Sequence, residues 1–241
     1  MEPIRSHDAL FRFVFGEPEQ IADLLRSCLP PELVAAIRWP TLRRLPDAFV
    51  DKALGERRSD VLYIVEIGDS VALVHLLNEH KSWVDRFTAL QQAGYTVRLL
   101  EAWRAEHPAA RTVPAVLSFV LYHGDEPWLA PTSPHELVDT TGWDAATLEL
   151  LLPRQLRLPF FLLDLSQFDE ARLDALRTSA VVGLTLRFLQ FLRHLGVLAA
   201  IDPIRRWQHL IAAVLEHPRG HDFLVALCSW LLGKEPADHD T

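Results

Sequence analysis

The sequence of 241 residues lacks the features that define several classes of protein. It has only two cysteines, Cys28 and Cys228, far apart and without a CxxC spacing, which argues against a disulfide framework and a zinc knuckle. No apolar run approaches the roughly 20 residues that span a bilayer, and the N-terminal MEPIRSHDAL lacks the pattern of a signal peptide. These absences predict a soluble protein of the reducing cytoplasm with no membrane partner.

Positive charge is also scarce. The chain has 24 Lys and Arg against 32 Asp and Glu, a formal net charge of -8, which argues against coating nucleic acid through the overall potential. A polyanion would have to bind a local patch, and the most basic stretch, residues 38–58, carries Arg43, Arg44, Lys52, Arg57 and Arg58. The alternative is that these side chains belong to a solvated charged loop.

The first third of the chain changes from helical to strand-like patterning. Residues 7–37 show the apolar spacing of two or three short helices, broken by Gly and Pro. The segments AFV (48–50), DVLYIVEI (60–67) and VALVHLL (71–77) are rich in β-branched and aromatic residues. We therefore predict a short first strand at 48–50, followed by a β-hairpin whose two-residue turn is Asp69-Ser70.

A helix and a strand are predicted after the hairpin. Ser82 is placed to cap a helix over about 84–106. Five apolar residues share much of one stripe of this helix, namely Phe87, Leu90, Val97, Leu100 and Trp103. The run AVLSFVLY then predicts a buried strand at 115–122. A helix that joins strands in this order favours an α/β sheet.

The remaining sequence is more helical. Residues 125–157 are Pro-rich and predicted to be irregular, and LPFFLLDLS from 158 predicts a further strand. Residues 169–233 predict three or four amphipathic helices, and the polar residues 234–241 a disordered tail.

Ionisable side chains gather at one end of the predicted hairpin. If Gly68 pairs with Val71, the ladder sets Asp60 opposite Glu79, and Lys81 shares the face of Glu79 because side chains two apart point the same way. Opposed carboxylates repel, so this arrangement predicts a divalent cation such as Mg²⁺, with the backbone carbonyl of His80 as a further ligand. Lys81 would then assist an attacking water or stabilise charge on a phosphate. The alternative is a surface salt-bridge cluster.

The spacing D-(x18)-E-x-K, formed by Asp60, Glu79 and Lys81, resembles the active-site pattern of the PD-(D/E)xK, or restriction-endonuclease-like, superfamily. The segments HDALFRFVFGEPEQIADLLRSCLPPEL, FVDKALGERRSDVLY, LNEHKS and VPAVLSFVLYHGDEPW are similar, in order and interval, to the Rpn family of recombination-promoting nucleases, also labelled transposases. This resemblance covers about residues 7–130. Members of this family often have Gln at the position of Lys81, so this site is closer to the pattern of the wider superfamily.

The resemblance implies a Mg²⁺-dependent DNA endonuclease with an αβββαβ core and a mixed sheet, in which Asp60, Glu79 and Lys81 form the site. Gln91 and Tyr95 lie four apart on the next helix and resemble the QxxxY element that supports such a site, although Gln92 is an alternative amide. Asp8 or Glu17, in the first helical region, is an alternative additional acid.

We accordingly expect a nuclease-like domain over residues 1–165 and a helical region over 166–233 packed on it. DNA is the expected partner, in recombination or in defence against foreign DNA, and a homodimer is an open alternative because nucleases that cut both strands commonly pair. Two rival functions remain. One is a catalytically silent module that binds DNA or protein, and the other is a transposase, which would require three carboxylates.

Overall fold

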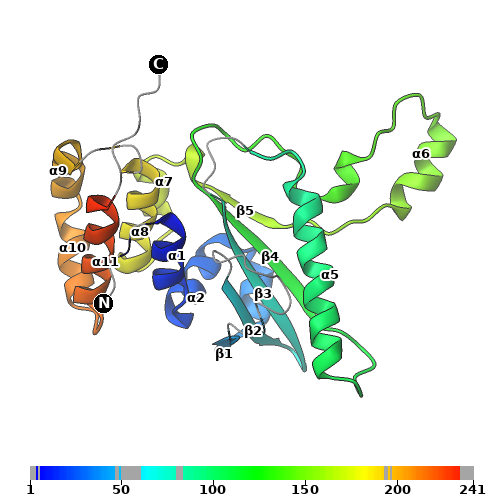
Figure 1. The fold of residues 1–241 in the computed structure, drawn as a ribbon, viewed down its shortest axis with the longest axis horizontal. Helices are drawn as coiled ribbons and strands as arrows, with labels where there is room; N and C mark the ends of the chain where they lie inside the picture. Colours follow the sequence, from blue (N-terminus) through cyan, green and yellow to red (C-terminus); the bar gives the residue numbers. More distant parts are fainter. Residues whose placement is uncertain are drawn as a thin grey trace.

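The computed structural model of the protein describes residue 4, residues 6–46, residue 49, and residues 61–79, 84–192, 195 and 197–233; for Asn78 and Glu79 it describes the backbone alone. The fold is α/β, as the sequence predicts, with a five-stranded mixed sheet between layers of helices (Figure 1). None of the helices in these ranges is both long and apolar enough to cross a bilayer.

The strands are arranged in the sheet in the order in which they occur in the chain. The first three are joined antiparallel, and the third, fourth and fifth run parallel to one another. The strands are β1 (Ile37–Arg44), β2 (Val61–Ile67), β3 (Ser70–Glu79), β4 (Ala115–Tyr122) and β5 (Phe161–Asp164). Strand β3 is therefore central, and β1 and β5 are the edges.

Helices cover both faces of the sheet unequally. On one face lie α1 (His7–Phe15) and α2 (Pro18–Cys28), with α3 (Pro31–Ala36) leading into β1. On the other face lies α5 (Thr88–Glu106), which connects β3 to β4 (Figure 1). This order of elements agrees with the predicted αβββαβ core.

The C-terminal helices extend the first layer. The predicted three or four helices are five, because Asp169 and Ser179 each cap a new helix and Trp207 separates two more. They are α7 (Glu170–Ala175), α8 (Ala180–Phe191), α9 (Val197–Arg206), α10 (Gln208–Leu215) and α11 (Gly220–Leu232). Helices α8 and α11 pack against α1, so the largest hydrophobic core is continuous from the sheet into these helices.

The first strand lies earlier in the chain than predicted. Residues 37–44 form β1, whereas Phe49, the described residue of the predicted strand, is helical. Pro40 cannot donate a ladder hydrogen bond, and it is tolerated because β1 is an edge strand whose register shifts between Arg38 and Arg43. The Pro and the three Arg in IRWPTLRR hid this strand from the sequence pattern.

The hairpin turn was predicted one residue too late. Ile67 pairs with Ser70, so Gly68 and Asp69 form the turn, and Gly68 has φ +58° as the first central position of a type II′ turn requires. The ladder continues to Val61 opposite Leu76, which corrects the predicted register by two residues. Asp60 lies outside the described residues, so the structure does not show its pairing with Glu79.

Helix α5 begins later than predicted and buries another face. It starts at Thr88, and the Asp85 carboxylate accepts from the Phe87 amide at 2.8 Å; the predicted cap Ser82 lies outside the described residues. Phe87, Leu90 and Val97 of the predicted apolar stripe are 56%, 52% and 46% exposed, whereas Leu100 is half-buried and Trp103 packs against a buried cluster. The face against the sheet carries smaller or polar side chains instead, namely Thr88, Ala89, Gln92, Ala93, Tyr95, Thr96, Leu99 and Ala102.

The region 125–157 is not wholly irregular. It contains the 3-10 turn η1 (Pro134–Leu137), helix α6 (Ala145–Leu151), capped by the Asp144 carboxylate, and the 3-10 turn η2 (Leu152–Arg154). With α6, this region projects from the rest of the molecule beyond α5 (Figure 1). We call residues 141–159 the arm.

A buried cation holds the C-terminal helices together. The Arg187 guanidinium, whose side chain is 4% exposed, donates to Glu170 at 2.9 Å, to the Gly183 carbonyl at 3.1 Å and to Asp174. Glu170 also accepts from the Trp207 indole at 2.7 Å. One network thus joins α7, α8 and the junction of α9 with α10.

We predict that Arg187→Ala destabilises the protein by about 1.5–3 kcal/mol, because it removes a buried guanidinium that donates to the Gly183 carbonyl, to the partly exposed Glu170 and to the exposed Asp174. Arg205→Ala is the control, since Arg205 is 77% exposed and lies 3.7 Å from Asp202, and its loss should cost at most about 1 kcal/mol. Urea unfolding followed by circular dichroism measures both. Equal losses would show that the Arg187 network contributes no more than a surface pair.

Candidate functional site

The central strand β3 presents alternate residues to the two faces of the sheet. Val74 and Leu76 belong to the core under α1 and α2, whereas Leu73 and Leu77 pack in two smaller clusters with residues of α5. His75 lies between these last two, contacts Tyr95 of α5, and is fully buried. Odd-numbered residues of β3 therefore face α5.

The neighbouring strands extend this face. On β2, Leu62 and Ile64 belong to the α5 side, and the opposite partner of Ile64 on β1 is Arg43. Directly opposed residues share a face, so the exposed Arg43 side chain lies on the α5 side, and the half-buried Arg44, opposite Tyr63, lies on the other. Both arginines are close to the start of β2 and hence to the end of the sheet at which β3 finishes.

Gln91 is linked to the segment that precedes α5. Its side-chain Nε2 donates to Asp85 Oδ2 at 2.8 Å, while Asp85 Oδ1 accepts from the Phe87 amide. Asp85 thus joins the chain before the helix to its first turn. This arrangement places Gln91 at the end of α5 that lies beside the end of β3.

Tyr95 is buried under the same face. Its ring meets His75 edge-on with centroids 5.8 Å apart, and the Arg98 guanidinium lies 4.9 Å from the ring centroid on another side. Gln91 and Tyr95 are therefore on the helix that covers the α5 face, as the predicted supporting role requires, but they differ in depth. Gln91 is half-buried and Tyr95 is 2% exposed.

Gln92, the alternative amide, makes the deeper polar contact. It is 1% exposed, and its Oε1 accepts from the Ser118 hydroxyl of β4 at 2.8 Å. Ser118 is the register partner of His75 on β3. His75, Ser118, Gln92 and Tyr95 form a buried polar layer between the two hydrophobic clusters of the α5 face. His75 and Ser118 were not predicted from the sequence. The one signal that could have indicated them is a polar residue inside each of two apolar strands.

The predicted metal site lies mostly outside the described residues. Asp60, His80 and Lys81 are outside them, and so are Lys52, Arg57 and Arg58 of the basic stretch. Glu79 is the last residue of β3, with its backbone opposite Tyr122 of β4. Among the described side chains, no group of three or more His, Cys, Asp or Glu is arranged to hold a metal. The proposed ligands thus remain predictions from the sequence.

The other predicted acids and histidines have structural contacts. Glu17 accepts from the Arg219 guanidinium, which ties α2 to the start of α11. His123, which follows β4, is 1% exposed and stacks on His7, with ring centroids 5.1 Å apart. His7 also meets Trp230 of α11 edge-on at 5.1 Å. These histidines join the end of β4 to the helical layer on the face opposite α5.

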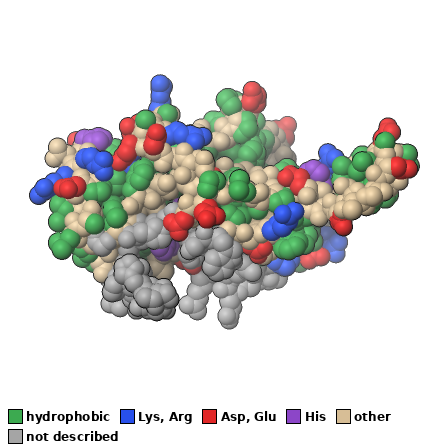
Figure 2. Space-filling model, turned by 90° about the horizontal axis from the view of Figure 1, so that it is seen from above, with side chains coloured by type: hydrophobic (Ala, Val, Ile, Leu, Met, Phe, Trp, Pro, Cys, Tyr) green, Lys and Arg blue, Asp and Glu red, His purple; other side chains and the backbone are tan. Residues whose placement is uncertain are grey.

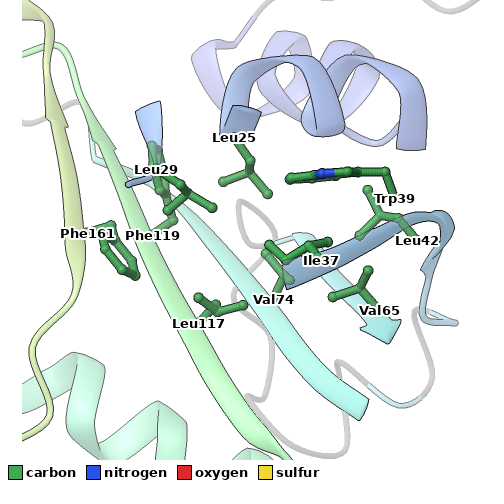
Figure 3. Close-up of a pocket in the computed structure, with 10 residues that line it drawn as sticks. All are labelled: Leu25, Leu29, Ile37, Trp39, Leu42, Val65, Val74, Leu117, Phe119 and Phe161. Carbon is green, nitrogen blue, oxygen red and sulfur yellow. The ribbon is translucent and has the colours of Figure 1, made fainter. Parts of the chain in front are cut away.

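The cavity beneath α2 is chemically unsuited to be the site. Its ten lining residues, which include Leu25, Trp39 and Phe161, are all hydrophobic (Figure 3). A nucleotide or metal would find no side-chain carboxylate, imidazole or cation there. The end of the sheet beside α5 is therefore the better candidate.

Comparison with known proteins identifies the family of the chain. A family model described as "Putative transposase, YhgA-like" matches residues 5–214. The chain belongs to this family. Three similar proteins bear Rpn names, which confirms the resemblance seen in the sequence. No solved structure matches the chain significantly.

These three relatives are from Escherichia coli. The K12 "Inactive recombination-promoting nuclease-like protein RpnE" is 31% identical over 65% of this chain and 49% of its own length. The K12 "Recombination-promoting nuclease RpnA" is 30% identical over 50% of this chain and 40% of its own, and RpnD of O157:H7 is 28% identical over 51% and 48%. The chain thus spans less than half the length of these relatives.

We predict that Ser118→Ala destabilises the protein by about 1–3 kcal/mol, because Gln92 Oε1 then loses its donor in a buried layer. The double variant Ser118→Ala/Gln92→Met should recover most of this loss, since both polar partners are then replaced by apolar atoms. Urea unfolding of the two single variants and the double variant gives the coupling energy. If the stability losses of the two single variants simply add in the double variant, the hydrogen bond between Ser118 and Gln92 does not contribute to stability.

Proposed function

We propose that this chain is a metal-dependent DNA endonuclease whose site lies where β3 ends beside α5. The observation that carries the proposal is the alternation of the sheet. Continuing β3 from Leu77 assigns Glu79 and Lys81 to the α5 face, and continuing β2 back from Leu62 assigns Asp60 to the same face. The three residues of the D-E-x-K pattern would then share one face and one end of the sheet.

The donor set fits a hard cation. Asp60 and Glu79 supply carboxylate oxygens and His80 a backbone carbonyl, which are the ligands that Mg²⁺ prefers, whereas an imidazole- or thiolate-rich set would favour zinc. When bound, the ion would polarise the scissile phosphate and lower the pKa of a coordinated water. Between two carboxylates on one face, it would also remove their repulsion.

The remaining residues of the proposed site would position the reacting groups or balance their charge. Lys81 is the cation of the pattern, and its ammonium would orient the attacking water or stabilise the charge that develops on the phosphate. Gln91 and Tyr95 would support the site from α5, since Gln91 fixes Asp85 at the start of the helix and Tyr95 packs on His75 beneath the strand.

Arg43 would guide the DNA backbone. It is exposed on the α5 side of β1, near the start of β2. The cations Lys52, Arg57 and Arg58, which follow in the sequence, are proposed to extend the same contact, whereas Arg44 lies on the other face of the sheet, opposite Tyr63, and does not share it. A local patch of this kind resolves the conflict between an acidic chain and a polyanionic substrate, because the attraction is needed only beside the site.

A catalytically silent member of the family is the second candidate. RpnE, and a further K12 relative named "Putative inactive recombination-promoting nuclease-like protein YjiP", carry the word inactive in their names. The chain itself retains Asp60, Glu79 and Lys81, which favours activity. DNA binding without any cleavage in the experiments below would favour the silent candidate.

We predict that the purified protein nicks or linearises plasmid DNA in Mg²⁺, that EDTA stops the reaction, and that Asp60→Asn and Lys81→Ala each lower the rate by about 100-fold or more. Asp60→Asn removes a ligand charge with little change of shape, and Lys81→Ala removes the cation beside it.

Asp69→Asn is the matched control, because Asp69 is a fully exposed acid in the turn at the opposite end of the hairpin. It should cleave at the wild-type rate. Cleavage that persists equally in Asp60→Asn and Lys81→Ala would place the chemistry elsewhere, and strand-transfer products would revive the transposase candidate.

We predict that Arg43→Ala weakens DNA binding for all sequences alike and reduces the slope of log K against log salt concentration by about 1, because one phosphate contact is lost. Fluorescence anisotropy over a salt series, in Ca²⁺ to limit cleavage, measures this slope. Arg205→Ala, on the distant helix α9, is the control and should leave it unchanged. An identical slope for Arg43→Ala would remove β1 from the DNA contact.

A further inference from the structure

The connection between β3 and α5 is short and is held at both ends. Strand β3 ends at Glu79, whose backbone lies opposite Tyr122 of β4, and helix α5 begins at Thr88. Lys81 belongs to this connection, two residues after Glu79 and four before Asp85. A short segment with two fixed ends has fewer conformations than one with a free end. The position of Lys81 should therefore depend on what holds the end at α5.

Asp85 holds that end through four hydrogen bonds. Its Oδ1 accepts from the Phe87 amide and its Oδ2 from Gln91 Nε2, both at 2.8 Å. Its backbone carbonyl accepts from the Thr88 amide at 3.0 Å and from the Thr88 hydroxyl at 2.8 Å. Asp85 thus joins the connection to the first turn of α5 with both its side chain and its backbone.

The first turn of α5 is itself anchored to the sheet. Thr88 is 1% exposed, and Ala89 is fully buried in the cluster that contains Leu77 of β3 and Tyr122 of β4. Leu77 lies two residues before the end of β3, and Tyr122 is opposite its last residue. A group fixed to this turn is therefore fixed relative to the end of β3, where the proposed site lies.

The contact of Gln91 defines its supporting role. Its side-chain amide donates to Asp85, a carboxylate, and a hydrogen bond to a charged acceptor is stronger than one between neutral groups. The effect of Gln91 on the site would then pass through Asp85 and the connection that Asp85 ends.

We propose that Asp85 is a positioning residue for Lys81. Its bonds to the Phe87 amide and the Gln91 side chain fix one end of the connection, and thereby the place of the Lys81 ammonium beside the carboxylates of the D-E-x-K pattern. A displacement of about 1 Å at a reacting group can cost about 100-fold in rate. Since Lys81 has this task only if the chain cleaves DNA, the role of Asp85 rests on the proposed function.

Plasmid cleavage in Mg²⁺ measures the effect on the rate. We expect Asp85→Ala to lower kcat by about 10-fold or more and to leave the KM for DNA within about threefold, because Asp85 orients a reacting group and does not bind the substrate. Circular dichroism and thermal melting establish that the variant is folded.

Asp144→Ala is the matched control. Asp144 Oδ1 accepts from the Thr147 amide at 2.7 Å as the cap of α6, so this variant loses the same kind of hydrogen bond. It lies in the arm, which projects from the rest of the molecule at the right of the space-filling view (Figure 2). It should cleave at the wild-type rate.

A double-mutant cycle with Lys81 separates positioning from a general loss of structure. Asp85→Ala should lower the rate by about 10-fold or more when Lys81 is present, but by less than about twofold in the Lys81→Ala background, because no ammonium is left to position.

An exchange of partners tests the hydrogen bond itself. Gln91→Glu sets two carboxylates against each other and should lower the rate as Asp85→Ala does. Asp85→Asn/Gln91→Glu restores a donor and an acceptor with their roles reversed, and the new amide oxygen can still accept from the Phe87 amide. We expect this double variant to cleave within about threefold of wild type.

Amide hydrogen exchange of residues 80–88 measures the anchor without cleavage. We expect exchange at least about 10-fold faster in Asp85→Ala and in Gln91→Glu than in wild type, because the connection opens more often when one end is released. Asp144→Ala should leave exchange in this segment unchanged.

Three results would overturn the proposal. They are cleavage by Asp85→Ala at the rate of Asp144→Ala, an equal loss in both backgrounds of the cycle, and unchanged exchange of residues 80–88. If wild type does not cleave DNA but exchange rises in Asp85→Ala, the proposed function fails while the anchor at Asp85 is supported.

Discussion

The position of β3 in the middle of the sheet is the constraint on which the rest of the structure depends. It pairs antiparallel with β2 through a two-residue turn and parallel with β4 through the crossover helix α5. The turn fixes the register of one pairing, and the crossover places a helix over one face of the other. Alternation along a single strand then decides which side chains meet α5 and which meet α1 and α2.

The two faces of the sheet are packed differently. The face under α1 and α2 shares one large core with α8 and α11, so most of the buried hydrophobic surface lies there. The face under α5 has two smaller clusters separated by the layer of His75, Gln92 and Ser118. A buried polar layer costs stability unless its groups are paired, but it fixes one arrangement of helix against strand. A site at the end of β3 would benefit from that fixed arrangement.

The local patterns in the sequence predicted much of this fold. The hairpin strands, the buried strand β4 and the helix after the hairpin follow from residue type and period alone. The errors arose where tertiary context decides. Edge position allows Pro40 in β1, a left-handed Gly68 moves the turn, and close packing on the sheet selects alanines rather than Phe87 and Leu90 for the inner face of α5.

The residues of the candidate site also fall into two groups, those that the sequence pattern predicts and those that only the folded structure brings together. The spacing of Asp60, Glu79 and Lys81 is visible in the sequence because the three residues lie within 22 positions of one another, beside the two strand-like segments of the hairpin. The contact of Ser118 with Gln92 is not, since it joins residues 26 apart that meet only when α5 packs on β4. Choosing between Gln91 and Gln92 likewise required the structure, because adjacent residues of a helix point in directions about 100° apart.

A separation of core from site would explain how one family can include proteins named as nucleases and proteins named as inactive. The proposal assigns the residues of the D-E-x-K pattern to the α5 face, whereas the largest core lies on the other face and continues into the C-terminal helices. Changing a carboxylate at a strand end removes no buried hydrophobic surface, and where two carboxylates repel it relieves strain on the fold. Under the proposed function, activity would therefore be under weaker structural constraint than the fold, and the presence of Asp60, Glu79 and Lys81 in this chain would reflect a requirement of chemistry rather than of folding.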